Sequence, residues 1–205
     1  MPTGFYTQHI CPCLLHLAMM HKSLRPYRER VVGGASGRVL EIGVGSGLNW
    51  PLYNSAADCV VGLDPSPSVL RRATQKAARA HIPVQLLEGS AEDLPFEGAS
   101  FDTIVTTWTL CTIQDASRAL TEMRRVLRPQ GLLLFVEHGR APEPRVAWWQ
   151  DRLDPLWSWI AAGCHLNRRI DALIGAKFRF EALRNTRLPG PRTHTYLYEG
   201  RARPV

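Results

Sequence analysis

The chain has 205 residues, of which 45% are hydrophobic and 21% charged, values that predict one globular domain with a full core and exclude a disordered chain. The formal net charge is +7, but the arginines are scattered singly or in pairs, so nucleic-acid binding is not expected. A weak attraction to anionic substrates or membrane surfaces stays open. Five cysteines, an odd number without paired spacing, favour reduced thiols and a cytoplasmic location.

The first patterned segment is the apolar run 10–20. It is too short for a membrane-spanning helix and lacks a cleavage site of small residues, so it predicts neither an anchor nor a signal peptide. We expect residues 1–30 to form a helical lid over the domain. Such a lid would bring Tyr6 and His9 towards a bound ligand.

Strand-like and helix-like patterns alternate over residues 38–137. Short aliphatic runs bounded by Gly, Pro, Asp or Ser are typical of strands buried on both faces of a parallel sheet. Such runs cover 38–42, 59–63, 83–87, 101–106 and 132–137, and helical periodicity covers 66–80 and 115–127. The alternation predicts an α/β fold with a doubly wound sheet.

The first of these strands ends in a glycine-rich turn, E-x-G-x-G-x-G from Glu41 to Gly47, and Asp64 closes the second strand. Glycines at such a turn allow tight chain reversal and close approach of a ligand, and a carboxylate at the tip of the next strand can bind a ribose diol. A dinucleotide pattern would need glycine where Leu48 stands. Glu41 would also repel a pyrophosphate but not a cationic ligand.

This arrangement resembles motifs I and II of class I S-adenosylmethionine-dependent methyltransferases, whose cofactor carries a sulfonium and an ammonium and no phosphate. The resemblance covers residues 38–137 and implies a Rossmann-like fold with a seven-stranded, mostly parallel sheet and an antiparallel last strand. It also implies S-adenosyl-L-methionine as the cofactor, and we expect no metal. The cofactor-binding residues that it implies are Tyr6, Glu41, Gly43, Gly45, Gly47, Asn49, Asp64, Pro65, Ser66, Ser90, Ala91, Glu92, Thr107 and Trp108.

Two of these assignments follow the family only in part. After the third strand, an acidic residue of the family commonly meets the adenine amino group, but Ser90 stands there, so the role is spread over Ser90, Ala91 and Glu92. Thr107 and Trp108 end the fourth strand, which in the family contacts the methionine end of the cofactor.

The pattern changes after residue 138, and we expect residues 138–177 to form a cap on the acceptor side and 178–205 to form the final strands, at 178–183 and 194–201. Four of the six tryptophans fall within 148–159. Trp149, Leu156 and Trp157 could share one helix face and build an apolar pocket. Asp154 and Pro155 predict the start of a new helix, with Asp154 as its N-cap.

This C-terminal third resembles the thiol S-methyltransferase branch of methyltransferase-like proteins in its E-H, W-Q…L-D-P-x-W and G-C-x-L-N-R series. Members of that branch from eukaryotes begin with a membrane anchor that this chain lacks, so a soluble protein is expected. The resemblance implies a small thiol as the acceptor, and a thiolate needs only a modest base or a cationic neighbour.

His138 is the most natural base by position, and Asp154 and His165 are the next candidates. Each also has a purely structural interpretation, as a loop bond, a helix cap or a surface turn residue. Cys111 and Cys164 could indicate arsenic methylation by cysteine ligation, but that family resemblance is absent, and a buried cysteine is commonly a small apolar residue.

Two other functions stay open. The acceptor could be a quinone-like ring or a phospholipid amine, because residues 38–137 also resemble enzymes of those kinds. The protein could also bind S-adenosylmethionine without catalysis, although an intact glycine turn with Glu41 and Asp64 argues against that.

Overall fold

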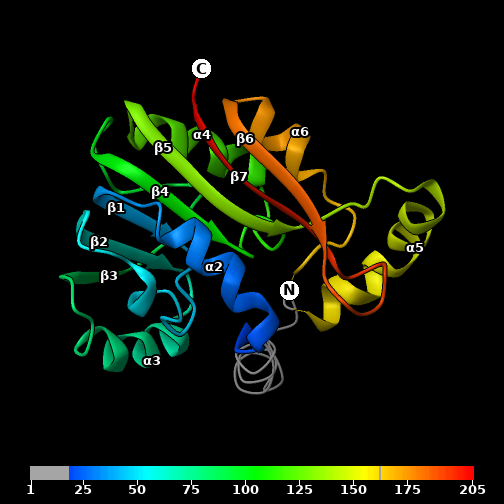
Figure 1. The fold of residues 1–205 in the computed structure, drawn as a ribbon, viewed down its shortest axis with the longest axis horizontal. Coiled ribbons are helices and arrows are strands. Elements are labelled where there is room, and N and C mark those ends of the chain that lie inside the picture. The colour runs from blue at the N-terminus through cyan, green and yellow to red at the C-terminus, as the bar shows by residue number, and fades with distance from the viewer. Residues whose placement is uncertain (1–18, 162) are drawn as a thin grey trace.

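A seven-stranded sheet with the strand order β3-β2-β1-β4-β5-β7-β6 forms the centre of the protein (Figure 1). The structure is a computed structural model that describes residues 19–161 and 163–205. Strand β7 runs antiparallel to both of its neighbours, and the other paired strands are parallel. The predicted α/β fold with an antiparallel last strand is confirmed. The strands are β1 (Gly37–Ile42), β2 (Ala57–Asp64), β3 (Val84–Glu88), β4 (Phe101–Thr107), β5 (Leu127–His138), β6 (Phe178–Arg187) and β7 (Tyr196–Pro204).

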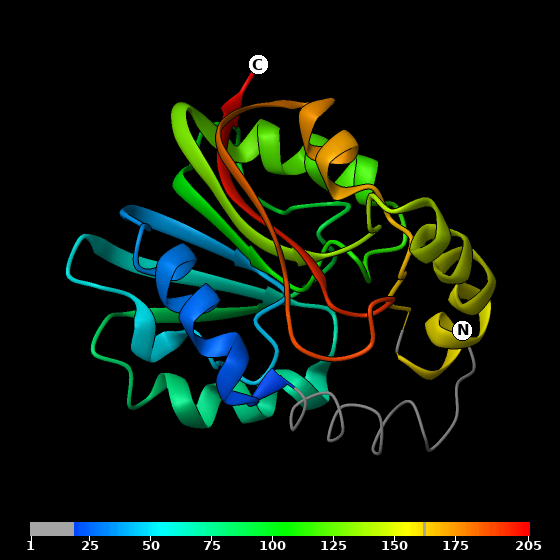
Figure 2. The same cartoon turned by 45° about the vertical axis from the view of Figure 1, so that its right-hand side comes forward.

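Helices cover both faces of this sheet (Figures 1 and 2). Successive residues of a strand point to opposite faces, so Val39 of β1 packs with residues of α2 and α3, whereas Leu40 packs with residues of α4 and α6. This two-sided burial explains why the central strands are continuously apolar. The helices are α2 (Arg25–Val32), α3 (Pro67–Ala77), α4 (Ala116–Val126), α5 (Pro144–Ile160) and α6 (Ile170–Gly175), with 3-10 turns η2 (Lys22–Leu24) and η3 (Trp50–Leu52).

Strand β5 begins five residues earlier than predicted, at Leu127 and not at Leu132. The chain passes directly from α4 into extended backbone at Leu127, which pairs with Phe101, and the register shifts before Thr103 meets Leu132. Arg128 and Pro129 therefore lie within the irregular start of the strand.

The predicted helix start at Asp154 and Pro155 is wrong, because α5 runs without interruption through Pro155. The Asp154 carboxylate is turned away from its own helix. It accepts hydrogen bonds from the backbone N–H of Leu166 at 2.6 Å and from the ring of His165 at 2.8 Å. The partners of Asp154 thus lie eleven and twelve residues further along the chain, beyond the range of a local capping pattern.

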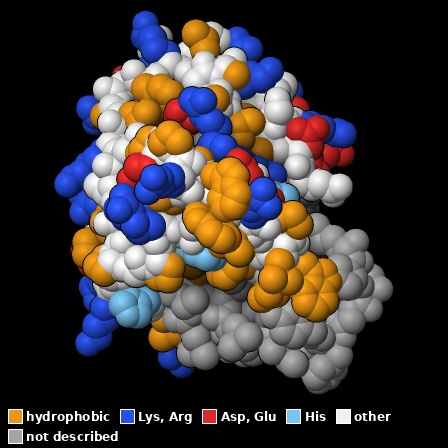
Figure 3. Space-filling view, turned by 90° about the vertical axis from the view of Figure 1, so that its right-hand side faces the viewer, with side chains coloured by type: hydrophobic (Ala, Val, Ile, Leu, Met, Phe, Trp, Pro, Cys, Tyr) orange, Lys and Arg blue, Asp and Glu red, His pale blue; other side chains and the backbone are white. Residues whose placement is uncertain are grey.

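The apolar face predicted for α5 is wrong for Trp149 and Leu156, although Trp157 is partly buried. The helix buries a stripe of small and polar residues, Ala147, Gln150 and Asp154, whereas Trp149 and Leu156 are 54% and 60% exposed. The amide of Gln150 explains this choice, because it accepts from the N–H of Ala141 and donates to the carbonyls of Gly139 and Thr193. Figure 3 looks onto this side of the molecule, where apolar side chains gather between arginines.

The described residues contain no helix that is long and apolar enough to cross a membrane. Tyr6 and His9 lie outside the described residues, as does most of the lid predicted for residues 1–30. The described part of that segment forms η2 and the start of α2, and α2 packs beside β5 and η3.

Candidate active site

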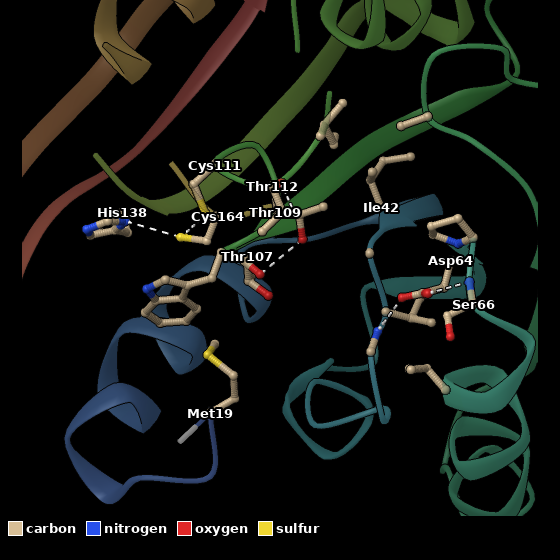
Figure 4. A pocket seen from close by; sticks show the side chains of 18 of the residues that line it. Met19, Ile42, Asp64, Ser66, Thr107, Thr109, Cys111, Thr112, His138 and Cys164 are labelled. Carbon is tan, nitrogen blue, oxygen red and sulfur yellow. Dashed lines mark hydrogen bonds between the residues drawn. The ribbon is translucent and has the colours of Figure 1, made fainter. Parts of the chain in front are cut away.

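A cavity of about 760 Å³ lies at the carboxyl ends of the parallel strands, a volume typical of small-molecule sites (Figure 4). Segments that follow β1, β2, β3 and β4 line it at one end and along its floor. The last residue of β5, the segment after α5 and the β6–β7 connection line the other end. One continuous cavity therefore joins most of the predicted cofactor residues to the C-terminal third of the chain.

The glycine-rich turn after β1 needs its glycines for conformational reasons. Gly43, Gly45 and Gly47 have φ angles of +70°, +54° and +72°, which place all three in the left-handed region. A Cβ at Gly47 would lie 2.0 Å from Nε1 of Trp50, and one at Gly43 would lie 2.4 Å from the Thr109 side chain. Gly43 and Gly45 line the cavity, whereas Gly47 lies behind it and allows the turn to close on Trp50.

Asp64 stands at the tip of β2 with its carboxylate in the cavity wall. One oxygen accepts from the N–H of Gly45 and the other from the N–H of Ser66, each at 3.0 Å. Burial raises the pKa of Asp64, and these two backbone bonds oppose the rise. Each carboxylate oxygen has two acceptor sites, so Asp64 holds the glycine turn in place and can still accept bonds from a ligand. Pro65 and Ser66 continue the wall beside it.

Glu41 lies beneath the turn and does not line the cavity. Its carboxylate is 1% exposed and accepts from Tyr53 Oη at 2.7 Å and from Asn49 Nδ2 at 2.9 Å. Burial raises the pKa of Glu41 to about 7, against the effect of these two bonds and of the positive charge of Arg28. Asn49 does line the cavity, so this amide connects the Glu41 carboxylate to it.

The amide of Asn49 connects three parts of the site. Its Nδ2 also donates to Oγ1 of Thr107 at 3.1 Å, which joins the turn after β1 to the end of β4. Its Oδ1 is buried and has no hydrogen-bond partner among the described residues. A buried acceptor without a partner is costly. The site therefore offers an acceptor, backed by a carboxylate, to a cationic donor of the ligand.

The segments after β3 and β4 complete this half of the cavity. Ser90, Ala91 and Glu92 line it, and Glu92 also accepts from the N–H of Asp115 at 2.6 Å. Thr107 and Trp108 line it from β4, and Trp108 has a φ of +52°, a strained conformation for a bulky residue. The guanidinium of Arg28, which the sequence patterns did not indicate, lies 4.8 Å from the Trp108 ring.

The opposite end of the cavity holds two cysteines and a histidine from three distant segments. The Sγ atoms of Cys111 and Cys164 lie 3.6 Å apart, and Nδ1 of His138 lies 3.8 Å from Sγ of Cys164 (Figure 4). The hydrogen bond between the thiols, followed by the influence of His138, lowers the pKa of Cys164, while the same bond and burial raise the pKa of Cys111.

Of the three predicted catalytic residues, only His138 lines the cavity. Asp154 and His165 lie behind the site, where their contact anchors the segment that carries Cys164. Trp157, one of the residues predicted to build an apolar pocket, lines the cavity, whereas Trp149 and Leu156 do not. His194 also lines it and was not predicted; the rings of His194 and Trp157 meet edge to face with centroids 4.3 Å apart. His194 sits in a strand connection, where no spacing pattern marks it.

Comparison with known proteins agrees with this geometry. A family model described as a methyltransferase domain matches residues 40–135. Thiol S-methyltransferase TMT1A of Homo sapiens is 32% identical over 176 residues, which cover 80% of this chain and 72% of that protein. The chain belongs to the S-adenosylmethionine-dependent methyltransferases. The predicted family and its cofactor are thus confirmed.

Two further methyltransferases show the extent of the likeness. Thiol S-methyltransferase TMT1B of Homo sapiens is 38% identical over 143 residues, 66% of this chain and 57% of that protein, so this chain spans little more than half of its length. The crystal structure of a putative methyltransferase from Bacillus halodurans has a TM-score of 0.70 at 16% identity and covers 90% of this chain and 100% of that one, which shows the shared fold.

The residues present fit the cofactor of this methyltransferase family. The Asp64 carboxylate suits a ribose diol, and the unpartnered Oδ1 of Asn49 suits an ammonium. S-Adenosylmethionine has no phosphate, and the turn after β1 presents no lysine or arginine that would hold one.

Proposed function

We propose that this protein transfers the methyl group of S-adenosylmethionine to the sulfur of a small thiol. The observation that carries the proposal is one continuous cavity, with Asp64 and the glycine turn at one end and the Cys111–His138–Cys164 cluster at the other. The similarity to two human proteins named as thiol S-methyltransferases supports it.

The cofactor would lie along the strand ends with its adenosine over β2 and β3. In this arrangement Asp64 binds the ribose, Pro65 and Ser66 flank the adenosine, and Ser90, Ala91 and Glu92 face the adenine. Asn49, supported by Glu41, takes the ammonium of the methionine end, and Thr107 and Trp108 position that end against β4. The Gly43 and Gly45 backbone would pass beneath the cofactor, and Gly47 would keep the turn closed.

The acceptor would then enter on the side of β5, α5 and the β6–β7 connection. Residues 138–177 would form the cap of this half, in which Trp157 and Leu197 provide apolar walls. His138 faces the acceptor and can take up a thiol proton, whereas Asp154 and His165 support the segment around Cys164. We propose these as the roles of the three predicted catalytic residues.

Methyl transfer at a sulfonium is an in-line displacement that removes the positive charge of the cofactor when a thiolate attacks. An enclosed apolar cavity favours this reaction, because water no longer stabilises the separated charges and the two reactants are held in line. A thiol suits such a site because its ordinary pKa of about 8.5 is close to neutrality.

Incubation with S-adenosylmethionine and a panel of thiols, phenols and amines, analysed by mass spectrometry, tests the proposal. We expect S-methylated products from small apolar thiols and none from the phenols or amines. Products from quinone-like rings or phospholipid amines alone would replace the thiol with one of those acceptors. Cofactor binding by calorimetry without any product across the panel would instead indicate a binding protein.

A further inference from the structure

We infer that Cys111, His138 and Cys164 form a binding site for a thiophilic divalent metal ion, of which zinc is the best match, at the acceptor end of the cavity. Their candidate ligand atoms all lie within 4.8 Å of one another. Two sulfurs and one imidazole nitrogen are a ligand set that zinc prefers, and magnesium and calcium do not bind such ligands well.

The distances match those around a tetrahedral zinc ion. Thiolates bind zinc at about 2.3 Å, which places two of them roughly 3.8 Å apart in a tetrahedron. The Sγ atoms of Cys111 and Cys164 are 3.6 Å apart, and Nδ1 of His138 is 3.8 Å from Sγ of Cys164. Two of the three distances between ligand atoms thus match, and the third, between Sγ of Cys111 and the His138 ring, is within 4.8 Å. Side-chain movements of up to about 1 Å would close the three ligands around an ion.

The imidazole of His138 is poorly explained by the protein alone. The residue is buried, and its Nε2 has no hydrogen-bond partner among the described residues, while Nδ1 faces only the sulfur of Cys164. A metal ion at Nδ1 would replace only this weak contact with sulfur, and Nε2, on the far side of the ring, would stay available to a ligand. A zinc ion with two thiolates also has no net charge, so the apolar cavity would not hold an uncompensated charge.

The three ligands leave the fourth position of the ion open. All three residues line the cavity (Figure 4), and none of the other described residues adds a Cys, His, Asp or Glu ligand to the cluster. Three protein ligands with an open fourth position are the pattern of catalytic zinc sites, whereas structural sites are closed by a fourth protein ligand. The open position faces the space in which the acceptor would lie.

This geometry gives the ion a role that rests on the proposed thiol methylation. The acceptor thiol binds in the open position as a thiolate and releases its proton to solvent. A sulfur lone pair then forms the bond to the methyl carbon while the bond from that carbon to the sulfonium breaks, which yields a methyl thioether and neutral S-adenosylhomocysteine. His138 would then be a metal ligand and not the base predicted from the sequence.

The site can be tested without an assay of methyl transfer, by titration of the metal-free protein with cobalt(II) while a phosphine reductant keeps the cysteines reduced. We expect one equivalent to bind with the sulfur-to-cobalt charge-transfer absorption and visible bands of a tetrahedral thiolate site, and zinc to displace it. Cys111→Ser, Cys164→Ser and His138→Gln should each weaken binding by at least about tenfold. Cys59→Ser removes a free cysteine from β2, away from the cavity, and should change nothing.

Absence of the thiolate spectrum, or a spectrum unchanged by Cys111→Ser and Cys164→Ser, would overturn the metal site. Trapping of a Cys111–Cys164 disulfide that forms readily in air and cannot be prevented by zinc would also contradict it. The assays separate the two proposals. Thiol methylation at an undiminished rate without any bound metal would remove only the ion, whereas a zinc site without methylation of any thiol would remove only the proposed function.

Discussion

Replacement of Glu41 by glutamine should remove a pH dependence from the stability of the protein. Burial raises the pKa of Glu41 from 4.5 to about 7. Between these values the carboxyl group ionises in the unfolded chain but stays protonated in the folded one, so the free energy of unfolding falls as the pH rises. One pKa unit corresponds to about 1.4 kcal/mol, so the wild type should lose roughly 3 kcal/mol between pH 4.5 and pH 7 through this group alone.

Glutamine keeps the shape of the side chain and removes the ionisation. Asn49 can still donate to its oxygen, and Tyr53 can accept from its amide. Urea unfolding at half-unit intervals from pH 4.5 to 7.5 should show a steeper loss of stability for the wild type than for Glu41→Gln. Other acids with raised pKa values, such as Asp64, are present in both proteins and cancel in the difference.

The matched control is Glu88→Gln, because Glu88 is exposed at the end of β3 and removal of its charge there should leave the wild-type slope intact. Parallel pH profiles of the wild type and Glu41→Gln would refute the reasoning. Such a result would mean that Glu41 is ionised in the folded protein throughout, with Arg28 and its hydrogen bonds outweighing its burial.

Three other substitutions test separate parts of the site. Asp64→Ala should weaken S-adenosylmethionine binding in calorimetry by roughly 1 to 3 kcal/mol, whereas Glu88→Gln should not, and an unchanged dissociation constant in a folded Asp64→Ala protein would remove Asp64 from the site. Gly47→Ala should destabilise the fold more than Gly45→Ala in urea, because both residues have positive φ but only the Cβ at Gly47 meets Trp50; equal losses would contradict this. Asp154→Ala should lower the free energy of unfolding by about 1 to 3 kcal/mol, because it leaves the buried N–H of Leu166 without a partner. Asp151→Ala removes an exposed ion pair with Arg140 and should lower it by at most about 1 kcal/mol. The opposite order would exclude Asp154 as an anchor.

The cofactor half of the protein could be predicted because its signals are local. A glycine turn with positive φ angles, an acidic residue before it and Asp64 at the next strand end all follow from neighbouring residues along the chain. Strand alternation predicted the sheet for the same reason, since each strand is buried on both faces and reads as a short apolar run. The largest shift of a boundary is at the start of β5, where an irregular register extends the strand by five residues.

Helix α5 could not be predicted correctly because its burial depends on partners elsewhere in the chain. Its tryptophans suggest an apolar inner face, but the helix turns inward the side on which Gln150 and Asp154 find backbone partners in the segments around Gly139, Leu166 and Thr193. The free energy lost by leaving a buried backbone group without a hydrogen bond is about as large as the free energy gained by burying an aromatic ring. Periodicity counts only apolar side chains and therefore misses such a choice.

The residues at the acceptor end of the cavity also depend on contacts between segments that are distant in the sequence. The methyltransferase family model ends at residue 135, so it contains Cys111 but neither His138 nor Cys164. Those two reach the cavity only because β5 ends there and because Asp154 holds the segment after α5 against the strand ends. A relative can therefore keep the whole glycine motif and bind the same cofactor while its C-terminal third presents different groups to the methyl carbon. Asp154→Ala should accordingly impair binding of cobalt at the cysteine cluster more than binding of S-adenosylmethionine, and an equal loss of both would show that the two halves of the cavity are not separable.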